Sequence, residues 1–116
     1  MERKRKERTM TGQEYQQLAK RTMQLDKDSD EMTVNALLGL SGEVGEINDY
    51  FKKHMFQGHI LFVDEVIEEL GDVMWYIALM CEALCIDMDD VMERNIKKLK
   101  KRYPDGFSVE RSVNRE

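Results

Sequence analysis

Apolar side chains recur at helical spacing through the two longest hydrophobic stretches of the chain. Within residues 33–54 they stand alternately three and four positions apart, and the same steps repeat within residues 63–85. Such steps draw one apolar stripe along an α-helix. The first stripe is Leu37, Leu40, Val44, Ile47 and Phe51, and the second is Val66, Leu70, Val73, Ile77, Met80 and Leu84. No segment competes with a strand-like alternation, so the pattern predicts an all-α protein.

Two further helices flank this central pair. Thr11 and Glu14 have the spacing of a capping box, which predicts a helix over about 12–25. A fourth helix is expected over about 88–102, because Asp87 can cap its start and a further apolar stripe follows. This stripe is Met92, Ile96, Leu99 and Tyr103.

The expected architecture is a four-to-five-helix bundle. The connection over residues 55–62 is short, so the second and third helices should be antiparallel neighbours. We expect residues 1–8 to form a flexible basic tail, residues 9–106 to form the helical domain, and residues 107–116 to form a C-terminal tail.

Three glycines, Gly39, Gly42 and Gly45, interrupt the second helix at steps of three. Each costs about 1 kcal/mol relative to alanine in a helix interior. The usual reason for such a cost is the close approach of another helix or of a ligand. We therefore expect the second and third helices to pack through their glycines.

The net charge of −5 conceals a separation of charge along the sequence. Residues 26–93 carry seventeen acidic and three basic side chains, whereas residues 94–103 carry six basic side chains and no acidic one. A general DNA-binding protein spreads basic charge over its folded surface, so this distribution disfavours nucleic acid as a partner. An acidic centre instead favours a cation, or an anion that a cation bridges.

The cysteines and the apolar segments indicate the cellular compartment in which the protein is expected. Cys81 and Cys85 lack the paired spacing of a zinc site, and we expect both to be buried and reduced. Reduced thiols suit a cytoplasmic protein. The most apolar segment, residues 73–88, contains Glu82 and Asp87 and is too short to span a bilayer, so we expect no membrane partner.

A short repeat places four acids at matching positions of the two central helices. Residues 43–51 align with residues 69–77, and each copy begins with an acid, an apolar residue, a glycine and a second acid. The i, i+3 spacing puts both acids of a copy on one side of its helix, at the edge of the apolar stripe. Antiparallel packing can therefore gather four carboxylates, those of Glu43, Glu46, Glu69 and Asp72.

Four neighbouring carboxylates repel one another and lose hydration at a buried edge. A divalent cation offsets both effects, and oxygen-only ligands select Mg²⁺, with Mn²⁺ as a possible substitute. A di-iron site would need Glu-x-x-His pairs, which neither His54 nor His59 completes. The alternative is a solvated acidic helix face, which is common for one Glu-x-x-Glu pair and less so for two phased copies.

The paired acids, with 22 residues between the pairs, resemble the signature of the MazG-like all-α nucleoside triphosphate pyrophosphohydrolases. The likeness runs from Leu37 to Phe107 and includes the segments LLGLSGEVGEINDYFKK, EELGDVMWYIALM and NIKKLKKRYPDGF. It implies a Mg²⁺-dependent hydrolase that converts a nucleoside triphosphate to the monophosphate and pyrophosphate. It also implies a homodimer or homotetramer, because the chain holds one short unit where tandem members of the family hold two.

The resemblance also implies roles for single residues. Positions that match the family's metal ligands are Glu43, Glu46, Glu69 and Asp72, and positions that match its nucleotide contacts are Asn95, Lys98 and Tyr76. Helix periodicity supports Asn95 and Lys98 independently, because both lie beside the apolar stripe of their helix, as the acids do. Lys53 is a further candidate for holding phosphate.

The expected reaction is attack of water on the α-phosphorus, with Glu46 or Glu43 as the general base. Two other functions fit parts of the pattern. A non-catalytic helical module that binds metal and nucleotide would keep the same residues, and a helical interaction protein would need none of them. Related branches of the family prefer dUTP, dCTP, phosphoribosyl-ATP or mixed nucleotides, so the motifs leave the base and sugar open.

Overall fold

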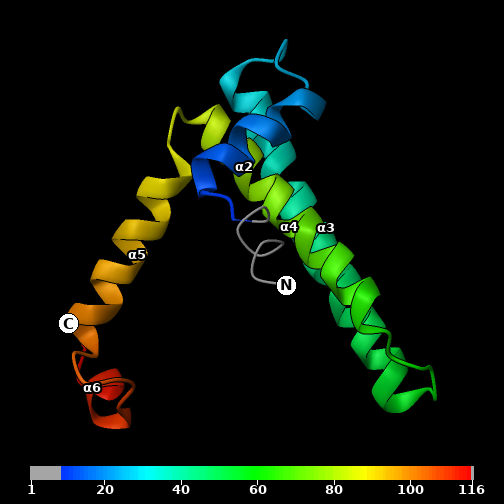
Figure 1. Ribbon diagram of the computed structural model, residues 1–116. Coiled ribbons are helices and arrows are strands. Elements are labelled where there is room, and N and C mark those ends of the chain that lie inside the picture. Colours follow the sequence, from blue (N-terminus) through cyan, green and yellow to red (C-terminus); the bar gives the residue numbers. More distant parts are fainter. Residues whose placement is uncertain (1–8, 116) are drawn as a thin grey trace.

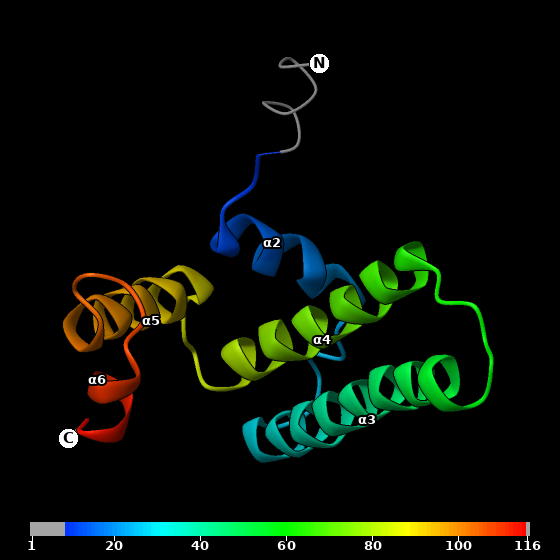
Figure 2. The same cartoon turned by 90° about the horizontal axis from the view of Figure 1, so that it is seen from below.

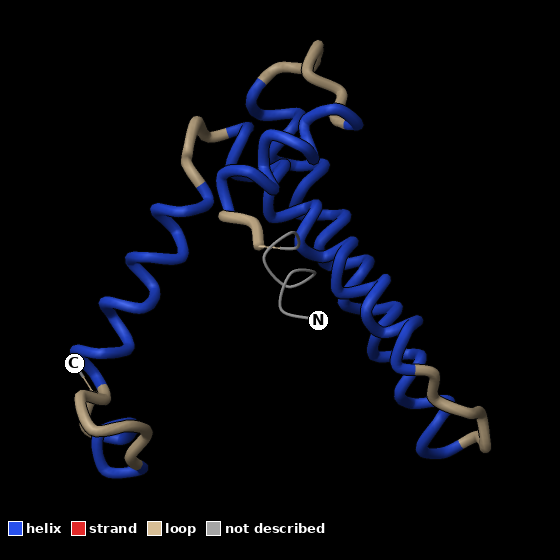
Figure 3. The backbone as a smooth tube through the Cα atoms, viewed as in Figure 1, coloured by secondary structure: helices blue, strands red, loops and turns tan. Residues whose placement is uncertain are grey.

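The computed structural model describes residues 9–115, which are mainly helical (Figure 1). Helix α2 spans Gly12–Ala19 and a 3₁₀ turn follows at Lys20–Thr22; α3 spans Ser29–Phe56, α4 Val63–Ala83, α5 Met88–Arg102 and α6 Val109–Val113. None of the described residues forms a strand, and Figure 3 shows helices joined by loops. The all-α fold class is therefore confirmed.

Helix boundaries follow local capping chemistry. The Asp28 carboxylate accepts a hydrogen bond from the backbone N–H of Glu31, so α3 begins earlier than the predicted residue 33. Asp87 caps α5 by accepting from the backbone N–H of Asp89, and this helix has the predicted bounds. Helix α2 is shorter than predicted, because the chain tightens into the 3₁₀ turn after Ala19.

Helices α3 and α4 lie side by side as an antiparallel hairpin, as predicted (Figures 1 and 2). The loop between them turns at Gly58, whose φ of +73° suits glycine. The backbone N–H of Phe62 donates to the Tyr50 hydroxyl over 2.8 Å, and His54 Nδ1 donates to the His59 carbonyl over 2.7 Å. These two bonds fasten the loop to α3.

The buried core lies at one end of the hairpin, where α2 packs against α4. Ala36 near the start of α3 and Ala78 and Leu79 near the end of α4 are almost completely buried, and Met32 and Met88 pack with them. None of these buried core residues belongs to a predicted stripe. Leu37 and Leu70 remain 51% and 50% exposed, so one apolar side of the hairpin is uncovered in a single chain.

A buried glutamine joins three elements at the core. The Gln16 side chain of α2 donates to the Glu82 carboxylate and to the Ile86 carbonyl, each over 2.9 Å. Its amide oxygen accepts from the backbone N–H of Met88 over 2.8 Å. Helix α2 therefore holds the start of α5 against the end of α4.

Helix α5 diverges from the hairpin after its first turns and forms a second arm (Figures 1 and 2). Gly12 allows α2 to approach α5, because a Cβ there would lie 2.8 Å from the Met92 sulfur. The predicted α5 stripe stays exposed, with Ile96 at 51%. The radius of gyration is 17.5 Å, against about 13 Å for a compact domain of this size. The apolar pattern alone predicts that the α5 stripe closes a four-helix core. Within one chain it does not.

Two expectations about the ends and the cysteines need correction. The segment predicted as a C-terminal tail includes α6, which Ser108 caps by accepting from the backbone N–H of Arg111. Cys81 is buried, as expected, whereas Cys85 is exposed and adopts a φ of 56° after the end of α4. The predicted N-terminal tail, residues 1–8, lies outside the described residues. Over the described range, no helix combines the length and the apolar character that crossing a membrane requires.

Candidate metal and nucleotide site

Three carboxylates from the two antiparallel helices meet about midway along the hairpin. Glu43 lies on α3, Glu69 and Asp72 lie on α4, and one oxygen of each lies within 4.8 Å of the other two. The i, i+3 spacing of Glu69 and Asp72 keeps both on one side of α4. We call this cluster the acidic trio. The repeat in the sequence predicts that these three residues lie together.

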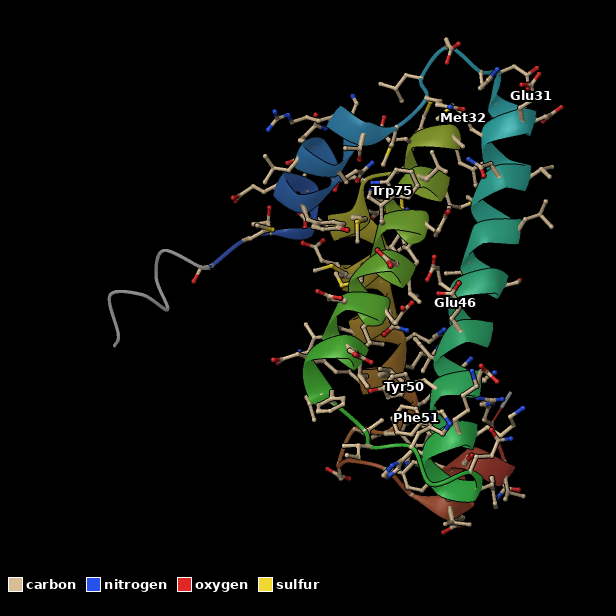
Figure 4. All side chains as sticks on the ribbon, turned by 90° about the vertical axis from the view of Figure 1, so that its right-hand side faces the viewer. Glu31, Met32, Glu46, Tyr50, Phe51 and Trp75 are labelled. Carbon is tan, nitrogen blue, oxygen red and sulfur yellow. The ribbon has the colours of Figure 1, made fainter. Side chains whose placement is uncertain are left out.

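The fourth predicted acid, Glu46, comes from the next turn of α3 (Figure 4). Its carboxylate interacts with Glu69 but lies outside the acidic trio. The pKa of Glu69 is raised to about 7, chiefly because the Glu43 carboxyl shares a hydrogen bond with it, then because of desolvation and the Glu46 carboxyl. A carboxyl pKa raised in this way indicates crowded negative charge.

The acidic trio also contains unsatisfied atoms. Glu43 Oε2 and Glu69 Oε2 are buried and accept no hydrogen bond. The lysines nearest in sequence are engaged elsewhere, because Lys52 and Lys53 pair with Asp49 at 3.4 and 2.9 Å. Buried carboxylate oxygens without a donor cost free energy unless a cation compensates them. The donor set is all oxygen and therefore fits a hard divalent ion.

A comparison with protein-family models assigns the chain to a family. The model of the MazG nucleotide pyrophosphohydrolase domain matches residues 32–107, a range that contains all four acids. The chain belongs to the MazG family. The resemblance stated from the sequence is therefore confirmed. MazG enzymes generally hydrolyse nucleoside triphosphates and generally depend on a metal ion.

One curated relative of this MazG chain is the Gene 37 protein of Mycobacterium phage L5. It is 36% identical over 85 residues, which cover 70% of this chain and 75% of the relative. No solved structure matches the chain significantly.

Tyr76, which the resemblance predicts to contact the nucleotide, packs between the two helices. Its ring lies directly against the backbone of Gly39, where an added Cβ would overlap the ring carbons. Trp75 meets the ring edge-on, with centroids 5.0 Å apart. The indole Nε1 of Trp75 donates to the Thr22 hydroxyl over 2.9 Å, which fixes the tryptophan in the fold. These contacts give Tyr76 and Trp75 packing roles in the single chain.

The expectation that all the helix glycines mediate packing is wrong for most of them. Gly39 does so, through Tyr76, whereas a Cβ at Gly42, Gly45 or Gly71 would meet no atom within 4 Å. The hairpin therefore packs closely at one glycine, and the other three border open space in the single chain.

Sequence reasoning missed a residue beside the acids. Tyr15 of α2 has a raised pKa because it is partly buried and because the charge of Asp72 acts on it. A hydroxyl at the edge of the acidic trio can donate a hydrogen bond to a carboxylate or to a ligand. Its sequence signal is only a weak apolar face on the first helix, which does not reveal contact with α4.

Lys53 lies about two turns along α3 from Glu46, near the hairpin loop. It lines a cavity of about 350 Å³ together with Tyr50, His59 and Glu65. Its ammonium group pairs with Asp49, and this pair lowers the pKa of the Asp49 carboxyl. In a single chain, Lys53 is therefore part of the loop end of the hairpin rather than of the acidic trio.

Asn95 and Lys98 lie on α5, in the arm that diverges from the hairpin (Figure 1). Both side chains are exposed. The single chain therefore does not bring these two candidates to the acidic trio. The helix on which they lie was predicted correctly, but its direction depends on the α2 contacts and the Cys85 turn.

Proposed function

We propose that this protein is a Mg²⁺-dependent nucleotide pyrophosphohydrolase that converts a (d)NTP to the (d)NMP and pyrophosphate by attack of water on the α-phosphorus. The observation that carries the proposal is the acidic trio, with two buried carboxylate oxygens that lack a hydrogen-bond partner. Membership of the MazG family supports the same reaction class.

The proposed ion-binding residues are Glu43, Glu46, Glu69 and Asp72. They offer only carboxylate oxygens, which suits Mg²⁺ and allows Mn²⁺ as a substitute. When bound, Mg²⁺ would offset the charge of the phosphate oxygens and lower the pKa of the attacking water. The surrounding helices hold the carboxylates in place because α3 and α4 contact each other along their length.

Glu46 is the preferred general base, and Glu43 is the alternative. Glu46 lies outside the acidic trio and is exposed, whereas Glu43 belongs to the trio and has a buried oxygen. A general base must keep a free lone pair within reach of the proton that it accepts. Glu46 meets this condition because a carboxylate has two oxygens, so one can accept the proton while the other binds the ion.

The nucleotide would be held by residues around this centre, with Asn95 and Lys98 on the phosphates, Tyr76 beside the nucleotide and Lys53 as a further cation. Since Asn95 and Lys98 lie on the diverging α5 arm, we propose a homodimer or homotetramer in which α5 of one copy approaches the acids of another. The uncovered apolar residues of α3, α4 and α5 support such an assembly.

A panel of nucleoside triphosphates scored by pyrophosphate release tests the proposal. Mg²⁺-dependent release is expected for at least one nucleotide. Glu46→Gln and Asp72→Asn should each lower it by at least ~100-fold while leaving the helical circular dichroism signal intact. Glu68→Gln is the matched control, because it removes the same charge from an exposed position of α4 outside the acidic trio.

Two results would contradict the proposed enzymatic activity. One is the absence of pyrophosphate from every nucleotide with Mg²⁺ or Mn²⁺. The other is calorimetric binding of metal and nucleotide without turnover, which would identify a non-catalytic binding module.

A further inference from the structure

A basic cavity lies away from the acidic trio, at the other end of the molecule. It has a volume of about 660 Å³ and lies between the end of α5 and helix α6. Figure 2 shows α6 beside the C-terminal half of α5. We call it the α5–α6 pocket and define it by the five cations that line it, Lys98, Lys101, Arg102, Arg111 and Arg115.

Local chain chemistry builds this pocket. Helix α5 ends at Arg102, and the chain turns at Gly106, whose φ is +92°. The Tyr103 and Phe107 rings pack across the turn with centroids 5.3 Å apart. Ser108 then caps α6, so the chain returns beside α5 instead of extending into solvent.

Helical spacing gathers the charges on the α5 side of the pocket. Lys98, Lys101 and Arg102 stand at i, i+3 and i+4, which places them on one side of α5. Arg111 and Arg115 are four residues apart at the other wall. None of these five cations forms an ion pair within residues 9–115. Glu110 is the single acid of the lining, so the pocket carries a formal charge of about +4.

A concentration of unpaired positive charge is costly, and an anion of matching charge relieves it. A triphosphate chain carries about four negative charges at neutral pH and presents several oxygens to arginine forks. The pocket volume falls within the range of about 300–1,000 Å³ that small-molecule sites occupy. Both features favour a small polyphosphate over a single phosphate ion.

We propose that the α5–α6 pocket binds a polyphosphate anion, such as the triphosphate chain of a nucleotide or an inorganic polyphosphate, and that Arg111 of α6 and Arg115, two residues after its end, are essential to it. This binding needs neither the acidic trio nor a divalent ion. Lys98 also belongs to the proposed substrate site, so the test changes Arg111 and Arg115, which that site does not include, and its outcome is separate from pyrophosphohydrolase activity.

Isothermal titration calorimetry with tripolyphosphate tests this site. The full-length Asp72→Asn protein is used in the presence of EDTA, so that neither turnover nor metal contributes to the heat. Tripolyphosphate should bind without metal, and Arg111→Ala together with Arg115→Ala should weaken the affinity by at least ~10-fold. The matched control combines Lys97→Ala with Lys100→Ala, which removes the same charge from α5 positions outside the pocket. Circular dichroism shows whether each variant keeps its helices.

The control pair should change the dissociation constant by less than about twofold. The proposal is overturned if tripolyphosphate does not bind, or if both pairs of substitutions weaken it equally, because the effect would then be diffuse charge attraction. A nucleotide with a non-hydrolysable α–β linkage distinguishes the two sources of the ligand. Tighter binding than tripolyphosphate indicates a nucleotide, and equal binding indicates that the phosphate chain alone is recognised.

Discussion

At the scale of single residues, the acidic trio shows which features of a site the spacing of residues in the sequence can predict. Two phased copies of an acid pair predicted that Glu43, Glu69 and Asp72 would meet, and one oxygen of each lies within 4.8 Å of the others. Periodicity specifies the side of a helix, and a short loop specifies its neighbour. Periodicity does not reveal the hydrogen bonds of the site, so the unpartnered oxygens of Glu43 and Glu69 emerge only from the structure.

The raised pKa of Glu69 predicts a specific pH dependence of stability in metal-free protein. Its folded-state pKa is about 7, against an ordinary value of 4.5, so the folded protein binds more protons between these values than the unfolded chain. The free energy of unfolding should therefore fall as pH rises through this window. Glu69→Gln removes the repulsion, so in EDTA it should be more stable than the native protein near pH ~8, with a smaller difference near pH ~5.

Urea unfolding at these two pH values measures the effect. Glu68→Gln, which removes a neighbouring carboxylate outside the acidic trio, should show no comparable dependence. Equal stability of Glu69→Gln and the native protein at the higher pH would show that the crowded charge is not costly.

At the scale of elements, the predictable features are those that depend on local sequence. The start of α5 follows from the Asp87 cap and the α3–α4 reversal from the short loop at Gly58. The direction of α5 could not be predicted, since it rests on contacts between residues distant in sequence, such as the Gln16 bond to Met88. Helix α6 has five residues, too few to show a periodic stripe.

The close contact of Tyr76 with Gly39 predicts an asymmetry among the α3 glycines. Gly39→Ala forces the ring or the helix to move, so it should lower the free energy of unfolding by about 1–3 kcal/mol. Gly42→Ala is the matched control, and a Cβ there meets no atom within 4 Å. It should raise stability by up to about 1 kcal/mol, because alanine favours helix. Chemical denaturation compares the two variants, and equal stability would contradict the packing described at Gly39.

At the scale of the whole molecule, the main feature is that one chain leaves much apolar surface uncovered. Its core occupies one end of the hairpin, while several stripe residues, such as Leu37 of α3, Leu70 of α4 and Ile96 of α5, stay about half exposed. The two arms in Figure 1 also keep the acids and the basic end of α5 apart. Both features are explained if a second copy covers the apolar faces and brings α5 to the acids.

Association of copies should depend on the exposed α5 stripe. Ile96→Glu places a charge on the stripe and should reduce the assembly mass to that of one chain in sedimentation velocity. Lys100→Gln changes the net charge equally but leaves the stripe intact, so it should keep the native mass. A native protein that sediments as one chain at all tested concentrations would contradict the proposed assembly.

The most direct test of the proposed function is hydrolysis of a nucleotide that the enzyme accepts, in water labelled with heavy oxygen and in the presence of Mg²⁺. Attack on the α-phosphorus predicts that the label appears in the nucleoside monophosphate and that the pyrophosphate is unlabelled. The same label should be absent when Asp72→Asn replaces the native enzyme. Label in pyrophosphate, or release of orthophosphate in place of pyrophosphate, would contradict the proposed reaction.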